Sequence, residues 1–358
     1  MGLRRAGQKT VSILGRRGPR FYLPVALAAA VVVAGIVVGS YALAHGFSPR
    51  VGKWTNLHAS GELPASAPNP GTYDVAARQA ITYYGRDSAS PMQTWAYDAG
   101  ARSFKDLKPA GQPPNILASA LAYDETFGRT VACGIVEGGA RAETWAYDSV
   151  TNSWSNLNPA VSPPPMNFPC LAYDGAIGKV VLFEGYNGRM LQGRTWAYDS
   201  SANTWVDLKC KGAPQIRAAA TMVYDGTSGR LILFGGMSFP GASPSDWAKS
   251  TWAYDSKSNT WTELKPATSP PARTGALMAY DLASGKVILF GGWSHDELLG
   301  DTWAYDSRTN TWTELNTAGS PGVRSGCVMF YDQVAGKTIL CGGAGRDRVW
   351  SDAWEFSL

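Results

Sequence analysis

Histidine is scarce in this chain: its 358 residues include three, His45, His58 and His295. Zinc and copper sites usually recruit several imidazoles, so this scarcity excludes a multi-histidine metal centre. A nucleophilic triad also needs a histidine base, and no serine nucleophile motif accompanies His295, the one histidine that falls at the tip of a repeat. The sequence therefore predicts no metal and no other cofactor, and it offers no defined set of catalytic residues.

Cysteine is nearly as rare, with five residues and no Cys-x-x-Cys pair, so neither a zinc motif nor a redox motif is indicated. Cys327 and Cys341 flank a short turn, and a hairpin that pairs Tyr331 with Lys337 would place them opposite each other. Facing cysteines of this kind could form a disulfide. The alternative is that both are small buried residues of a strand pair.

Excess charge is also absent from most of the chain. There are 32 basic and 28 acidic residues, but residues 1–20 hold six of the basic ones and no acidic one. Removing these six leaves 26 basic against 28 acidic residues, a balance of about −2. Proteins that bind nucleic acid carry a strongly basic surface, so no nucleic-acid partner is predicted.

One long uncharged run is present, at residues 21–44. As a helix it would measure about 36 Å, enough to cross a hydrocarbon core of about 30 Å. The basic residues before it should stay in the cytoplasm, which places the rest of the chain outside. The alternative is a signal peptide that is cleaved after Ala44, giving a secreted protein. We expect a cytoplasmic segment at 1–20, a transmembrane helix or uncleaved signal anchor at 21–44, and a linker at 45–52.

Tryptophan provides the strongest positive signal. Five copies of Thr-Trp-Ala-Tyr-Asp and a related sixth segment follow one another at intervals of 50, 51, 56, 51 and 51 residues. A period of this size is typical of repeat architectures. Each period contains four short β-rich runs with turn residues between them, which predicts a four-stranded blade. The periodic tryptophans are Trp95, Trp145, Trp196, Trp252, Trp303 and Trp354.

The repeat count predicts how the ring closes. The Tyr-Asp pair that ends the first strand occurs six times, but only five units are followed by a fourth strand with its aromatic residue. Residues 53–57, with Trp54, match that missing strand and precede the first unit. We therefore predict an all-β, six-bladed β-propeller at residues 53–358, closed by its N-terminal strand. The fourth-strand aromatics that follow are Phe104, Trp154, Trp205, Trp261 and Trp312.

The repeats carry the marks of a known family. A Gly-Gly pair precedes Tyr305, Trp312 follows seven residues later, and Pro321–Gly326 shows the lead-in Pro-x-x-Arg-x-Gly. This pattern resembles the kelch repeat, which implies a kelch-type propeller with the fold of galactose oxidase. Kelch proteins also include substrate adaptors, actin binders and a periplasmic sialic acid mutarotase. The copper site of galactose oxidase needs two histidines, and this chain cannot provide it, so the resemblance indicates the fold and leaves the function open.

Binding residues are expected on one face of the ring, where the loops between second and third strands meet the connections between blades. Three arginines stand there at one repeat position, eight residues before the aspartate of Tyr-Asp. Guanidinium groups bind carboxylates in pairs, so an anionic sugar or peptide group is a candidate ligand. In the alternative interpretation the arginines pair within the blades. The candidate ligand-binding residues are Arg217, Arg273, Arg324, Arg189, Tyr186, Trp293 and His295.

Together these features predict a membrane-anchored extracytoplasmic propeller that binds a protein or a saccharide. The alternative is a sugar mutarotase or epimerase resembling the sialic acid mutarotase, in which Asp296 or Glu297 would act with Arg273 as the acid–base group. The longest blade tip, residues 237–249, is a candidate for partner-specific contacts.

Overall fold

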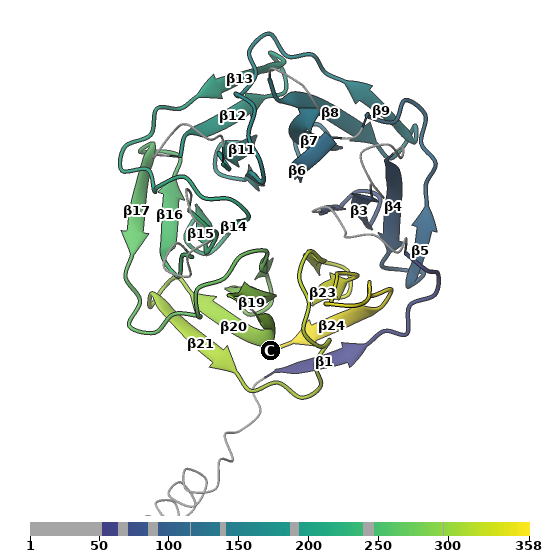
Figure 1. Cartoon of the computed structure of the whole chain (residues 1–358), viewed down its shortest axis with the longest axis vertical. Helices are drawn as coiled ribbons and strands as arrows, with labels where there is room; N and C mark the ends of the chain where they lie inside the picture. Colours follow the sequence, from purple (N-terminus) through teal and green to yellow (C-terminus); the bar gives the residue numbers. More distant parts are fainter. Residues whose placement is uncertain are drawn as a thin grey trace, which may run out of the picture. The chain divides into compact units, whose positions relative to one another are not determined.

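The computed structural model arranges the chain's strands in six four-stranded antiparallel sheets around a common axis (Figure 1). This architecture confirms the six-bladed, all-β propeller that the repeats predict. The structure describes residues 52–63, 71–84, 92–114, 116–136, 141–186, 193–238, 247–295 and 297–358, all within the unit Arg50–Leu358. None of these residues forms a helix long and apolar enough to span a bilayer. The segment 21–44 lies outside the described residues.

Each blade takes its strands in chain order from the axis outward, except the last. Blade one contains β2 (Thr72–Asp74), β3 (Gln79–Tyr84), β4 (Gln93–Asp98) and β5 (Ser103–Asp106). Blade two contains β6 (Ile116–Asp124), β7 (Arg129–Val136), β8 (Glu143–Asp148) and β9 (Ser153–Asn156). Blade three contains β10 (Cys170–Asp174), β11 (Lys179–Phe183), β12 (Thr195–Asp199) and β13 (Thr204–Asp207).

The second half of the ring repeats this order. Blade four contains β14 (Thr221–Asp225), β15 (Arg230–Phe234), β16 (Thr251–Asp255) and β17 (Thr260–Leu264). Blade five contains β18 (Leu277–Asp281), β19 (Lys286–Ser294), β20 (Glu297–Asp306) and β21 (Thr311–Leu315). Blade six contains β22 (Val328–Asp332), β23 (Lys337–Cys341), β24 (Ala353–Ser357) and, on its outer edge, β1 (Lys53–Asn56).

Alternate residues of a second strand pack against opposite neighbours, because successive side chains point to the two faces of a sheet. In β19, Val287 and Leu289 join a cluster with residues of blade four. Ile288 and Phe290 join a cluster with residues of blade six. All four side chains are fully buried. A continuous apolar run is therefore the expected sequence for a strand that is covered on both faces.

Side-chain oxygens accept hydrogen bonds at the turns between strands and so stabilise the turn conformations. At the end of β18, the carboxylate of Asp281 accepts a hydrogen bond of 2.8 Å from the Ser284 amide, and Gly285 closes the turn with a φ of 66°. Between β20 and β21, Asn310 has a φ of 52°, a conformation that asparagine tolerates better than most residues. Its side chain accepts a hydrogen bond of 3.0 Å from the Tyr305 hydroxyl.

Neighbouring blades are joined by a buried hydrogen bond that repeats around the ring. The indole N–H of each fourth-strand tryptophan donates to a threonine hydroxyl on the third strand of the preceding blade. The five bonds measure 2.8 or 2.9 Å, and each threonine stands directly before a periodic tryptophan or its equivalent. The pairs are Trp54–Thr302, Trp154–Thr94, Trp205–Thr144, Trp261–Thr195 and Trp312–Thr251.

The ring closes as the sequence predicts. In Figure 1, β1 (purple) lies beside β24 (yellow), and the two strands pair antiparallel with Trp54 opposite Phe356. Trp54 is 2 % exposed and packs edge-on against Phe290 of blade five, with ring centroids 5.3 Å apart. The N-terminal strand thus contributes both the outer edge of blade six and the contact between blades five and six.

The sixth interface replaces this hydrogen bond with an apolar contact. Blade one has Phe104 at the tryptophan position, and blade six has Ala353 at the threonine position, so neither donor nor acceptor is present. Both side chains are buried in the same cluster. Phe104 departs from the repeated tryptophan, and Ala353 departs from the repeated threonine that would accept its hydrogen bond. The substitution of Phe104 for tryptophan therefore has a structural rather than a functional explanation.

The expected register of the cysteine hairpin is wrong by one residue. Asp332 pairs with Lys337, so Cys341 stands opposite Val328 rather than Cys327. Because side chains alternate along a strand, this shift sends the two thiols into different clusters on opposite faces of blade six. Both cysteines are free and buried, and burial raises the pKa of Cys327 to about 12. The bridge between them is therefore not formed, and two small buried residues describe the pair.

The paired change at the sixth interface is testable by a double-mutant cycle. Phe104→Trp alone should lower the free energy of unfolding by about 1–3 kcal/mol, because its indole N–H would be buried against Ala353 without an acceptor. Adding Ala353→Thr should restore at least half of that loss, measured by urea unfolding. The reverse exchange, Trp312→Phe with Thr251→Ala, is the matched control and should show the same coupling. Strictly additive effects at both interfaces would contradict the assigned pairing.

Candidate binding face of the propeller

Loops from two parts of each blade meet on one face of the ring, as the strand order predicts. We call it the loop face: it is formed by the loops between second and third strands and by the connections that lead into each blade. Backbone bridges join the two sets in four blades, which fixes their relative positions. The bridges are Asn167–Tyr186, Ala218–Met237, Thr274–Trp293 and Ser325–Ala344.

The centre of the loop face opens into an uncharged axial cavity of about 550 Å³. Its described lining includes Phe168, Trp293 and small residues such as Ala219 and Ser325, and none of these lining residues is charged. A collar of first-strand side chains lines both this cavity and a second one, of about 420 Å³, toward the opposite face. The collar residues are Leu121, Leu171, Met222, Met278 and Met329, which share one repeat position.

The candidate arginines lie inside the blades rather than in this cavity. Arg273 is fully buried, and its two terminal nitrogens each donate a hydrogen bond of 2.7 Å to the carboxylate of Asp301. It also donates to the carbonyl oxygens of Pro271 and Gly291, at 3.0 and 3.1 Å. Arg273 thus ties the entry of blade five to the middle of its third strand, β20. The structure matches the alternative in which these arginines pair within the blades.

The acid in this pair stands two residues before the periodic tryptophan. Burial alone would raise the pKa of Asp301, but hydrogen bonds from Arg273 and the charge of its guanidinium hold that pKa below its ordinary value. The same carboxylate accepts a hydrogen bond of 2.7 Å from the Trp303 indole. Blade six repeats the arrangement with Arg324, Asp352 and Trp354.

Blade three holds an ion pair in the same region of the blade, but its two charged residues stand at different repeat positions. Arg194 stands at the position of Asp301, and Glu184 replaces the first glycine of the Gly-Gly pair. The Arg194 guanidinium lies 3.1 Å from the Glu184 carboxylate, which is fully buried and also accepts a 3.0 Å hydrogen bond from the Trp196 indole. The sequence shows Glu184 in place of a glycine, but only the structure shows that Arg194 pairs with it.

The other candidate residues occupy different parts of the loop face. Trp293 lines the axial cavity and donates a hydrogen bond of 2.8 Å to the Ser325 hydroxyl. His295 is exposed and stacks on Trp247 of blade four, with ring centroids 5.6 Å apart. Tyr186 is half-buried in the bridged loop of blade three. Arg189 lies outside the described residues, so the seven candidates are not brought together into one pocket.

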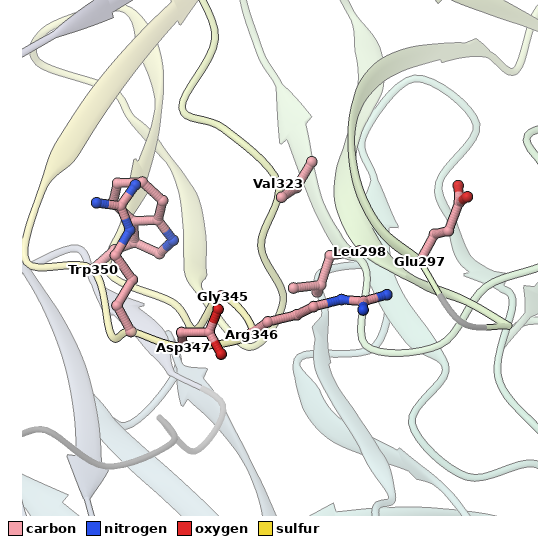
Figure 2. Close-up of a pocket in the computed structure, with 8 residues that line it drawn as sticks. Glu297, Leu298, Val323, Gly345, Arg346, Asp347 and Trp350 are labelled. Carbon is pink, nitrogen blue, oxygen red and sulfur yellow. The ribbon is translucent and has the colours of Figure 1, made fainter.

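A groove of about 450 Å³ separates the blade-five loop from the blade-six loop, and the sequence did not single it out (Figure 2). The exposed Arg348 stacks on Trp350, with its guanidinium carbon 3.5 Å from the ring centroid. Buried Arg324 covers the same ring at 4.3 Å. Val323, half exposed, and the exposed Glu297 complete the opposite wall.

Arg273 and Glu297, two of the three proposed acid–base residues, have different surroundings in the described part of the chain. Arg273 contacts Asp301, whereas Glu297 is exposed on the groove between blades five and six. Asp296 lies outside the described residues. Among the residues that the structure describes, no cluster of three or more histidine, cysteine or acidic side chains could hold a metal ion.

Residues 176–358 match the KLHDC2/KLHL20/DRC7 Kelch-repeats domain. The chain is 29% identical over 146 residues to Mei4-dependent protein 6 of Schizosaccharomyces pombe, which covers 38% of this chain and 21% of that protein. It is 28% identical over 153 residues to tRNA wybutosine-synthesizing protein 4 of Emericella nidulans, covering 40% of this chain and 14% of that protein. The chain spans less than a quarter of the length of these curated relatives.

The Arg273–Asp301 pair predicts a pH-dependent stability. Asp301→Asn should lower the free energy of unfolding at pH 7 by about 3 kcal/mol, because it leaves the buried guanidinium without its counter-charge. The folded-state pKa of Asp301 is depressed, so its contribution is present above the unfolded value of about 3.9 and is lost as the pH falls through the folded value. The difference between wild type and variant, measured by urea unfolding, should therefore shrink below about pH 4.

The control for this prediction is Asp347→Asn, the same exchange at an exposed loop position. It should change stability by less than about 0.5 kcal/mol at either pH. An equal loss from both substitutions at pH 7 would show that the Arg273–Asp301 pair does not stabilise the blade.

Proposed function

The chain belongs to the kelch-repeat family, and on this basis we propose that its propeller is a protein-binding module whose loop face contacts the partner. The fold presents six sets of loops on one rigid ring, an arrangement in which loop residues are free to carry binding. Every described periodic tryptophan has a structural task within its blade or cluster. Recognition is therefore assigned to the loops and not to the repeat.

The neutral axial cavity favours an apolar or neutral protein segment over an anionic sugar. An acidic saccharide would need arginines that line the axial cavity. Arg273 and Arg324 instead form salt bridges with Asp301 and Asp352 inside their blades. Phe168, at the rim of the cavity, keeps about half of its surface exposed (53 %). Exposed aromatic groups of this kind are typical anchors at protein interfaces.

The observation that carries the proposal is the Arg348–Trp350 stack beside exposed Val323. Tryptophan and arginine dominate the binding energy at protein interfaces, especially where they flank an apolar pocket. We therefore place the main contact in the groove between blades five and six.

We also propose that residues 21–44 tether the propeller to a membrane, with the propeller on the extracytoplasmic side. Support comes from the sequence: an uncharged run of spanning length follows a basic segment. Strand β1 begins at Lys53, so few residues separate the proposed span from the ring. A partner would then meet the propeller close to the bilayer.

The binding role can be tested with one charge-changing substitution on each face. Arg348→Glu in the full chain should reduce recovery of the specific partner at least tenfold, because it reverses the charge that stacks on Trp350. Val334→Asp, on the exposed turn between β22 and β23, is the matched control and should leave recovery unchanged. The measurement is quantitative mass spectrometry of cross-linked, affinity-purified complexes. Loss of the same partners from Val334→Asp, with full retention by Arg348→Glu, would place binding on the opposite face.

The tether can be tested by extraction and N-terminal analysis. The full-length protein should stay in the membrane pellet after washing at about pH 11, and Val32→Arg with Val37→Arg should release it, since each central arginine opposes insertion by about 3 kcal/mol. A soluble product that starts at His45 would instead indicate cleavage and secretion. Extraction of the full-length wild-type protein into the wash would contradict both forms of the proposal.

A further inference from the structure

Blade four contains the buried arginine of blades five and six but lacks its acid. Arg217 corresponds to Arg273 and Arg324, whereas the position of Asp301 and Asp352 is taken by Ser250. The same backbone contacts are kept: Arg217 donates to the carbonyl oxygens of Gln215 and Gly235, at 3.3 and 3.2 Å. A single hydroxyl, Ser250 Oγ at 3.0 Å, stands where the other blades provide two carboxylate oxygens.

The charge of Arg217 is therefore buried without the ion pair that balances its counterparts. The residue is 7 % exposed, and no carboxylate of the described residues forms a salt bridge with it. Burial lowers the pKa of Arg217 to about 10, so the group still carries its charge at neutral pH. A buried charge of this kind is costly unless a counter-charge reaches it.

Space for such a counter-charge lies next to the guanidinium. A cavity of about 440 Å³ is lined by Arg217, Ser250, Trp247, Trp252 and Glu263, among others. The Trp252 indole donates to Ser250 Oγ at 3.1 Å, as the Trp303 indole donates to Asp301 in blade five. The donors that hold a carboxylate in blades five and six are thus present in blade four, beside an open volume and two indole rings.

We propose that this blade-four pocket binds the carboxylate of a ligand, which occupies the place that Asp301 and Asp352 hold in their own blades. The ligand carboxylate accepts hydrogen bonds from the Arg217 guanidinium, and Trp247 and Trp252 contact the apolar or aromatic body that carries it. Two sources provide this chemistry: a small carboxylic acid, or an acidic side chain of a protein. The site is separate from the groove between blades five and six, so it stands or falls independently of the proposed partner contact.

Glu263 limits the affinity of the blade-four pocket for a carboxylate. Its exposed carboxylate lines the same cavity, where its negative charge favours the charged form of Arg217 and repels a bound anion. Exposed charge pairs interact weakly, by about 0.2–1 kcal/mol. Glu263→Gln should therefore tighten carboxylate binding by roughly twofold to fivefold.

The test uses benzoate as the probe and the full-length protein, with binding followed by saturation-transfer NMR. Wild type should bind benzoate at least tenfold more tightly than benzamide, which has the same shape without the charge. Ser250→Asp should abolish benzoate binding and raise the melting temperature, because the new carboxylate fills the site from within. Ser250→Ala, which adds no charge and leaves the space open, should keep benzoate binding within about threefold.

A glutamate peptide capped at both ends serves as the second probe. Its binding, lost in Ser250→Asp, would assign the site to acidic protein side chains, whereas binding of benzoate alone would assign it to small acids. Equal binding of benzoate and benzamide, or equal losses in Ser250→Asp and Ser250→Ala, would overturn the proposal. So would failure of both acids to bind wild type and Glu263→Gln.

Discussion

The buried indole N–H of each fourth-strand tryptophan needs an acceptor, and in this ring that acceptor is a threonine hydroxyl of the neighbouring blade. The hydrogen-bonding residues of the repeated motif Thr-Trp-Ala-Tyr-Asp each have such a partner. In blade five, Thr302 accepts from Trp54 of the next blade, Trp303 donates to Asp301, Tyr305 donates to the turn asparagine, and Asp306 accepts a turn amide. The motif recurs because each polar group in it satisfies a buried partner.

The same constraint explains why the arginines do not form a ligand-binding half-ring. A fully buried guanidinium such as Arg273 requires nearby acceptors, and the blade provides them from its own backbone and Asp301. The centre of the loop face is left neutral, while charge and aromatic surface gather at its rim, in the groove of Trp350 and the pocket of Arg217. Variation between blades, rather than the repeat, therefore distinguishes one part of this face from another.

Much of the fold could be predicted because it depends on local patterns that repeat. The position of Trp54 was enough to predict ring closure, since a single unmatched strand preceded the first unit. The candidate site was harder, because it depends on which side chains meet. Counting residues across a hairpin failed for Cys327 and Cys341 by one position, and that step reverses the face of a strand. Trp350 gave no signal, as it belongs to no repeat position.

The sequence by itself determined the architecture of this protein: a period of about 51 residues, four strands in each unit, and a sixth blade built from both ends of the chain. Only the tertiary structure decided the roles of its polar residues. Phe104 and Ala353 are 249 positions apart in the sequence yet change together, and Arg217 differs from Arg273 only through Ser250. Hydrogen bonding and charge balance depend on distances of about 3 Å across the fold, and such distances have no counterpart along the chain.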